Sequence, residues 1–183
     1  MDNLLSIFLF SVVMTITPGP NNIMILSSGL NFGIKKSLPH LLGIAFGFPI
    51  MLIAVGLGLD VLIAQSPIFH TIVKVLGVGY LLYLAFKLFT TTKRSSIEGS
   101  SKPFTFSQVV LFQWVNPKAW VMIFSGLGTF ATAIDMQSTT FIIALSFFIA
   151  IFPCNGLWLF LGSQMQTIIK NDTHFKLFNR TMA

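Results

Sequence analysis

Residues 15–22 read Thr15-Ile16-Thr17-Pro18-Gly19-Pro20-Asn21-Asn22 and interrupt an apolar run that extends from Leu4 to Leu30. The two prolines remove backbone donors and the glycine loosens the chain, so carbonyl groups one turn earlier lose their helical partners. At membrane depth such groups are tolerated only where protein buries them or where they line a water-filled cavity. A simple proline kink is the alternative interpretation. The concentration of prolines, glycine and asparagines favours a break built for binding.

The composition indicates a polytopic membrane protein embedded in the lipid bilayer. Of the 183 residues, 54% are hydrophobic and only 9% are charged, and the mean hydropathy is +0.84, whereas a soluble domain carries about 25% charged residues. The net charge of +6 comes from basic residues scattered through short connections between apolar runs, so we expect no nucleic-acid partner. Cys154 is the single cysteine, which excludes an internal disulfide.

Five apolar runs are long enough to cross a bilayer. They cover about residues 4–30, 38–59, 71–89, 106–132 and 140–165. We therefore expect an all-α membrane helix bundle with five spans. Residues 1–90 would form a first three-helix repeat, residues 91–105 a basic cytoplasmic linker, and residues 106–183 a second repeat. This second repeat is expected to be incomplete, with two spans and the start of a third, because too few residues follow for a sixth helix.

The distribution of basic residues predicts the orientation in the membrane. Lysine and arginine gather in the first, third and fifth connections, whereas the opposite side holds Lys74 alone, together with Asp2, Asp60 and Asp135. Basic connections tend to remain in the cytoplasm. We therefore expect the N-terminus outside and the basic loops inside.

A second break is predicted in the fourth span, at Asn116-Pro117. The first span enters the membrane from outside and the fourth from the cytoplasm, so the two broken helices would be antiparallel, as in an inverted repeat. Corresponding breaks in two inverted halves predict a binding site near the midplane between them. The fifth span carries a third breaker group at its centre, Pro153-Cys154-Asn155-Gly156.

Lys118 is the only charged residue well inside a span. A charge at the bilayer centre costs about 3 kcal/mol on insertion scales, so such residues usually face the bundle interior or a cavity. The alternative is a lysine that snorkels to the interface. An ammonium beside Asn116 and Gln113 suits a substrate carboxylate, and the helix ends exposed by Pro18 and Pro117 suit the two ends of a zwitterion.

The predicted substrate-binding residues come from both broken spans and from the third span. They are Pro18, Gly19, Pro20, Asn21, Asn22, Tyr80, Gln113, Asn116, Pro117 and Lys118. Tyr80 has a second interpretation as an anchor at the membrane interface. Gly43 and Gly47, one turn apart in the second span, and Gly77 in the third are expected to let helices pack closely.

The sequence argues against an enzyme and against an ATP-driven pump. It contains no metal-ligand spacing, no phosphate-binding glycine loop and no set of nucleophile, base and acid. We therefore expect no cofactor and no metal. No Asp or Glu lies at the centre of a predicted span, so the residues reveal no carboxylate relay for a coupling proton.

Three motifs carry a family resemblance. They are Thr17-Pro18-Gly19-Pro20-Asn21, Gly77-Val78-Gly79-Tyr80-Leu81-Leu82-Tyr83-Leu84-Ala85-Phe86-Lys87 and Asn116-Pro117-Lys118-Ala119. Together they resemble the LysE-type amino-acid exporters, the group of the lysine, homoserine/threonine and leucine exporters. The resemblance implies a bacterial inner-membrane secondary transporter, driven by the proton motive force, with an inverted repeat of three plus three helices. Its matching elements here are Pro18, Gly19, Pro20 and Asn21, with Asn116, Pro117 and Lys118 opposite.

We predict an exporter of amino acids or related small metabolites that works by alternating access between its two halves. Family members usually continue through a sixth helix, and residues 178–183 look like its start. The alternative is a truncated or inactive remnant, or a non-transporting membrane subunit of the same fold. A passive channel for small polar solutes is a further rival. A homodimer is one way to fill the place of the sixth helix.

Overall fold

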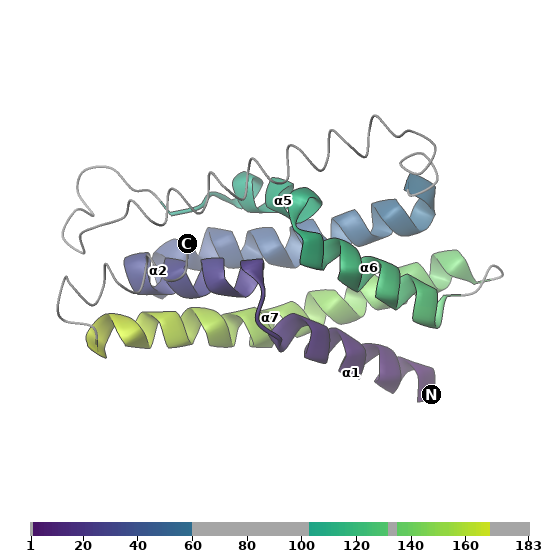
Figure 1. Ribbon diagram of the computed structural model, residues 1–183, viewed down its shortest axis with the longest axis horizontal. Helices are drawn as coiled ribbons and strands as arrows, with labels where there is room; N and C mark the ends of the chain where they lie inside the picture. Colours follow the sequence, from purple (N-terminus) through teal and green to yellow (C-terminus); the bar gives the residue numbers. More distant parts are fainter. Residues whose placement is uncertain (1, 60–102, 132–134, 169–183) are drawn as a thin grey trace.

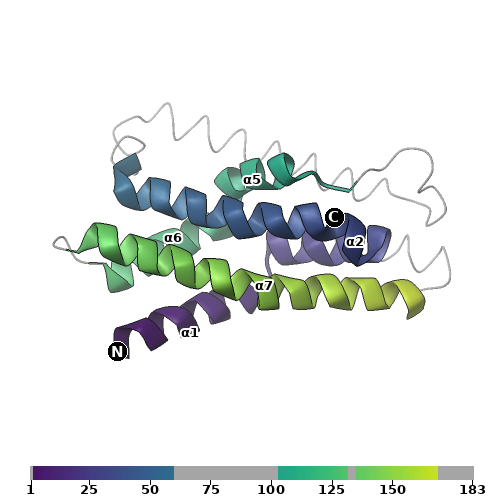
Figure 2. The ribbon, with the colours of Figure 1, turned by 180° about the vertical axis from the view of Figure 1, so that it is seen from behind.

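The computed structural model describes residues 2–59, 103–131 and 135–168, and these residues are helical, with no strand among them. The elements are α1 (Asp2–Ile16), α2 (Pro20–Ala54), the π-helical turn η1 (Val55–Leu59), α5 (Phe106–Val115), α6 (Pro117–Phe130) and α7 (Met136–Ile168). They lie along one common long axis (Figures 1 and 2). The predicted third span, most of the predicted linker and the end of the chain lie outside the described residues.

The element α2 is a helical hairpin rather than one straight helix. Gly33 has φ 75° and ψ 176°, a conformation that non-glycine residues rarely adopt, and the chain reverses there (Figure 1). The first arm runs from Pro20 to the turn and the second arm continues from the turn to Ala54. Ser28 Oγ and Ser37 Oγ join the two arms at 2.8 Å. The predicted basic connection between the first two spans is thus this tight turn, where Lys35 and Lys36 are exposed.

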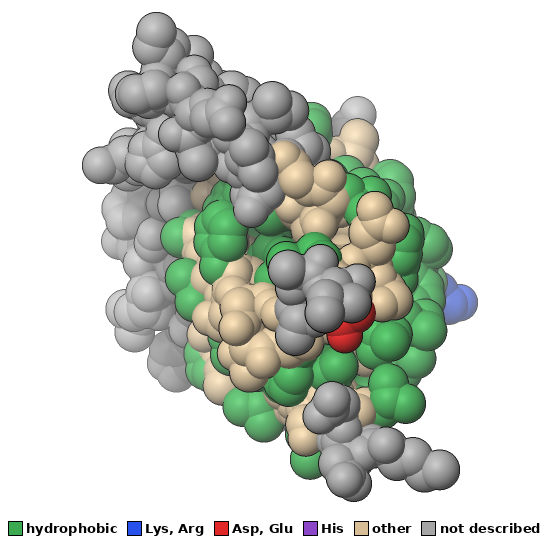
Figure 3. Space-filling view, turned by 90° about the vertical axis from the view of Figure 1, so that its right-hand side faces the viewer, with side chains coloured by type: hydrophobic (Ala, Val, Ile, Leu, Met, Phe, Trp, Pro, Cys, Tyr) green, Lys and Arg blue, Asp and Glu red, His purple; other side chains and the backbone are tan. Residues whose placement is uncertain are grey.

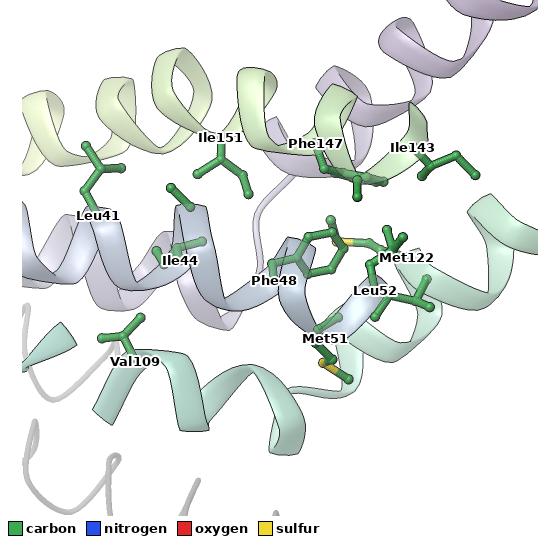
Figure 4. Packing of buried hydrophobic residues seen from close by; sticks show 14 of the residues in the cluster. Leu41, Ile44, Phe48, Met51, Leu52, Val109, Met122, Ile143, Phe147 and Ile151 are labelled. Atoms are coloured by element: carbon green, nitrogen blue, oxygen red, sulfur yellow. The ribbon is translucent and has the colours of Figure 1, made fainter. Parts of the chain in front are cut away.

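The second arm of α2 forms the centre of the bundle. It packs against α7 on one side and against α5 and α6 on the other (Figure 4). Phe48, which is 1% exposed, meets Phe147 of α7 with ring centroids 4.8 Å apart. The buried core also contains Leu41, Ile44, Met51, Leu52, Val109, Met122, Ile143 and Ile151.

Large apolar side chains also cover the outside of the bundle. Leu111 is 67% exposed and Leu5 is 62% exposed, and Figure 3, which looks at the bundle end-on, shows hydrophobic side chains around the circumference formed by described residues. Two helices are long and apolar enough to cross a bilayer, Pro20–Gly58 and Met136–Met165. An apolar exterior over apolar helices suits a bundle surrounded by lipid, in which tight packing rather than burial from water holds the helices together.

Small residues allow close helix contacts at two places. A Cβ atom at Gly43 would lie 2.9 Å from Phe106 O, and one at Gly47 would lie 2.9 Å from Val110 Cα, so the second arm of α2 touches the backbone of α5. Gly29 of the first arm and Gly162 of α7 make a second contact of this kind: a Cβ at either glycine would meet a backbone carbonyl of the other helix. Gly77 lies outside the described residues.

The breaker group of the fifth span does not interrupt its helix. The helix α7 is continuous through Pro153-Cys154-Asn155-Gly156. A single proline removes one intrahelical hydrogen bond, which membrane helices tolerate where neighbouring helices pack around the site. At the first break two prolines flank a glycine, and the helix does end.

The two spans that do break run in opposite directions. The chain passes from right to left through α1 and the first arm of α2, and from left to right through α5 and α6 (Figure 1). This is the arrangement that an inverted repeat requires. Because residues 60–102 and 169–183 lie outside the described part, the five spans and the complete repeat stay predictions.

Candidate functional site between two broken helices

The first break separates α1 from α2 at Thr17, Pro18 and Gly19. A helix end leaves its last four carbonyl groups without intrahelical partners, and proline brings no N–H group to replace them. Side chains from three helices and from the break itself supply the donors. Thr17 Oγ1 donates to Met14 O (3.0 Å), Asn22 Nδ2 to Thr15 O (2.9 Å), Trp158 Nε1 to Ile16 O (3.1 Å) and Lys118 Nζ to Thr17 O.

Lys118 connects the two broken helices. It is the second residue of α6, and its ammonium also contacts Thr17 Oγ1 at 3.0 Å and Pro18 O at 3.5 Å. The carbonyl end of α1 carries the negative end of the helix dipole, so a positive charge is stabilised there. Gly19 provides the space, because a Cβ atom at this position would lie 2.5 Å from Lys118 Cδ. The glycine of the first motif therefore leaves room for Lys118 of the Asn116-Pro117-Lys118-Ala119 motif.

The second break, between α5 and α6, is satisfied by its own residues. Asn116 has φ −79° and ψ 110° and caps α6, since its Oδ1 accepts from Lys118 N at 3.1 Å. Its N–H donates to Gln113 O at 3.2 Å. Trp120 Nε1 donates to Trp114 O at 2.8 Å and so reaches back across the break. Pro117 occupies the first helical position, where its missing N–H costs nothing.

The start of α2 is open by contrast. Its N-cap is Gly19, which offers no side-chain cap, and Pro20 holds the first helical position. The first N–H groups of a helix have no intrahelical partners and carry the positive end of the dipole. An uncapped helix start of this kind suits an anionic ligand group.

Asn21 and Gln113 form a second link between the broken helices. Asn21 Nδ2 donates to Gln113 Oε1 at 2.9 Å, and Gln113 Nε2 donates to Asn21 Oδ1 at 3.3 Å and to Val109 O at 3.0 Å. Gln113 is fully buried. This pair fixes the start of α2 against α5.

A small polar cavity lies between the two breaks. Its volume is about 20 Å³ of space open to the centre of a water molecule, which is room for one or two waters. The polar part of its wall consists of Thr15, Asn21, Asn22, Asn116, Lys118 and Asn155. The apolar part consists of Met14, Ile44, Phe48, Ala119, Met122 and Ile151.

Two buried oxygens in this wall have no hydrogen-bond partner. They are Thr15 Oγ1, on a residue that is 5% exposed, and Asn155 Oδ1, on a residue that is 1% exposed. An unpaired buried polar group costs about 1–3 kcal/mol. Groups of this kind at a cavity suit a ligand or a water molecule that brings a donor.

Four of the ten residues predicted for binding line this cavity. Asn21, Asn22, Asn116 and Lys118 line it. Pro20 and Pro117 instead begin helices, and Tyr80 lies outside the described residues. Among the described residues, no group of His, Cys, Asp and Glu is placed to hold a metal ion.

Sequence reasoning missed two residues of the cavity wall as binding residues, Thr15 and Asn155. Thr15 opens the stretch Thr15 to Asn22 that contains the first break, and Asn155 stands in the breaker group Pro153-Cys154-Asn155-Gly156 of α7. The signal that could have found them was a polar side chain inside an apolar span, which is uncommon and often functional.

Comparison with known proteins identifies the family. A family model described as "LysE type translocator" matches residues 12–183. The curated relatives include proteins named "Cysteine/O-acetylserine efflux protein" from Escherichia coli strain K12 and from Shigella sonnei strain Ss046, each 29% identical over 165 residues that cover 88% of this chain and 83% of the relative. No solved structure matches. The chain therefore belongs to the LysE family of translocators, which are membrane transport proteins.

Proposed function

We propose that this protein exports small amino acids or their derivatives from the bacterial cytoplasm, across the inner membrane, at the cavity between the two breaks. The observation that carries the proposal is the contact between Lys118 of one broken helix and the carbonyl groups of Thr17 and Pro18 of the other. Family membership and relatives named as cysteine/O-acetylserine efflux proteins support the direction and the substrate class.

The carboxylate of the substrate would bind between Lys118 and the uncapped start of α2. Both groups are positive, and both lie where the two breaks face each other. The ammonium of Lys118 donates to Thr17 Oγ1 and to Pro18 O. A carboxylate therefore competes with α1 for the same ammonium, so substrate binding would loosen the link between the two helices.

Transport then requires a change of shape. The cavity has room for one or two waters, not for an amino acid. Substrate must therefore bind a form of the protein in which this cavity is larger. Alternating access of this kind is the usual mechanism of transporters built from inverted repeats with broken helices.

We further propose five spans, with the N-terminus outside and the basic loops in the cytoplasm, and coupling to the proton motive force. Lys35 and Lys36 at the turn of α2 support this orientation. Reporter fusions after the turn at Gly33 and after Phe130 test it: the first should report a cytoplasmic position and the second an external one.

Efflux of internally loaded amino acids tests the function. Cells that express the chain should lose cysteine or O-acetylserine faster than vector controls, and an uncoupler should abolish the difference. Lys118→Met should reduce the rate at least tenfold, because a hydrogen bond to a charged group contributes about 1.5–3 kcal/mol. Lys36→Met is the matched control, since it removes an exposed lysine outside the site.

The outcomes separate the rivals. Saturable, uncoupler-sensitive efflux that Lys118→Met abolishes supports the exporter. Flux that neither saturates nor responds to the proton gradient indicates a channel. Efflux equal to vector with the protein present in the membrane contradicts the proposal and favours a non-transporting subunit.

A further inference from the structure

We infer that Asn155 of α7 and Thr15 of α1 form a subsite for the ammonium group of the substrate, opposite the carboxylate site at Lys118. The inference rests on the proposed function and assigns the second end of the substrate. It gives α7 a direct part in binding.

The burial of the two oxygens is the first argument. Asn155 is 1% exposed and Thr15 is 5% exposed, yet Asn155 Oδ1 and Thr15 Oγ1 have no partner, and both residues line the cavity. Buried polar atoms in proteins are nearly always paired. Two unpaired oxygens on one cavity wall, from two different helices, suit a ligand that brings the missing donors.

The hydrogen bonds already made around the cavity decide which chemistry fits. Asn22 Nδ2 donates to Thr15 O, and Asn116 Oδ1 accepts from Lys118 N. Among the fully buried side-chain atoms of the described wall, Thr15 Oγ1 and Asn155 Oδ1 are the two without a partner. An ammonium group has three donors and no acceptor, so it complements two acceptors and does not compete for the carbonyl groups of the break.

The residues that line the cavity also restrict the charge and size of the substrate. Among the described residues that line the cavity there is no carboxylate, and two neutral oxygens suit one ammonium group rather than two. The remaining wall is apolar, with Ile44, Phe48, Met122 and Ile151 among its residues. The site therefore fits a compact α-amino acid with an uncharged side chain, and it disfavours one with a second cationic group.

The test uses three probes that differ in one group at a time. Cysteine carries both charged groups, 3-mercaptopropionate lacks the ammonium, and cysteamine lacks the carboxylate. Their dissociation constants are measured with the purified full chain in detergent, for the parent protein and for Asn155→Leu, Thr15→Val and Lys118→Met. Ser11→Ala is the matched control, since it removes a buried hydroxyl that donates to Ile7 O and does not line the cavity.

The inference predicts that substitutions in the ammonium subsite and at Lys118 weaken the binding of different pairs of probes. Asn155→Leu should weaken cysteine and cysteamine about tenfold and leave 3-mercaptopropionate unchanged, and Thr15→Val should do the same to a smaller extent. Lys118→Met should weaken cysteine and 3-mercaptopropionate and leave cysteamine unchanged. Ser11→Ala should change none of the three.

Any other result contradicts either the ammonium subsite or the proposed substrate class. Equal weakening of cysteine and 3-mercaptopropionate by Asn155→Leu overturns the ammonium subsite and leaves the exporter intact, because the parent chain still binds. A parent chain that binds none of the three probes overturns the proposed substrate class and the subsite with it. Unchanged binding of 3-mercaptopropionate also shows that Asn155→Leu and Thr15→Val are folded.

Discussion

Each helix break leaves backbone carbonyl groups without intrahelical donors, and the two breaks obtain these donors from different parts of the protein. At the second break, the cap of Asn116 and the indole of Trp120 satisfy the interrupted backbone from within the same span. At the first break, the donors to Ile16 O and Thr17 O come from Trp158 of α7 and Lys118 of α6. The second break is therefore stabilised by residues of its own span, whereas the first break depends on side chains of other helices.

This difference assigns them different roles. A break that caps itself keeps its geometry when surrounding helices move. A break whose carbonyl groups depend on other helices changes when those helices shift or when a ligand takes their donors. We therefore expect substitutions at the first break to affect transport most, and substitutions at the second to affect mainly stability.

Gly19→Ala should have the largest effect. The new Cβ atom would lie 2.5 Å from Lys118 Cδ and 3.1 Å from Lys118 Nζ, so the lysine must leave the carbonyl groups of the first break. Efflux should fall about tenfold or more, with little loss of folding stability, because Gly19 has φ −174° and any residue adopts this extended conformation. The control is Gly128→Ala in α6, where an added Cβ would meet nothing within 4 Å. Equal efflux in the two variants would contradict the role of the close contact.

Asn116→Ala should destabilise the second break by about 1 kcal/mol, the usual cost of a lost N-cap. Thermal unfolding in detergent measures this effect. Asn116→Ser keeps a capping oxygen and should restore most of the stability. If alanine is as stable as serine, the second break does not depend on its cap, and the contrast between the breaks fails.

The pair Asn21 and Gln113 joins the breaks, and a double-mutant cycle sharpens the comparison. Asn21→Ala, Gln113→Ala and the double variant should give a coupling energy of about 1 kcal/mol in unfolding free energy, since two hydrogen bonds connect the side chains. Additive effects would show that the two breaks are independent.

Gly156→Ala should have the smallest effect and the opposite sign. The helix α7 is continuous there and an added Cβ would meet nothing within 4 Å, so alanine should raise stability by about 0.5 kcal/mol through its better helix propensity. Efflux should be unchanged. A destabilised or inactive variant would mean that α7 bends at this point during transport.

The sequence predicted the two real breaks because each combines proline with residues that end helices, namely glycine in the first and asparagine in the second. The breaker group at Pro153 leaves its helix continuous, because the sequence does not reveal whether packing compensates for the hydrogen bond that a single proline removes. The role of Lys118 as an unusual charge was visible, but its partner Thr17 was not, because 101 residues separate them and only the fold brings them together. The same applies to Asn155, whose unpaired oxygen is a property of the packed site.

The indole of Trp158 bears on how the protein is made. It donates to Ile16 O across 142 residues, so α1 reaches the membrane long before its last carbonyl group has a partner. At about 5–20 residues per second of synthesis, the nascent chain spends roughly 7 to 28 seconds before Trp158 is made. During that interval the insertion machinery or bound water must shelter it. A chain that ends before Trp158 therefore lacks the donor that pairs with Ile16 O in the complete bundle.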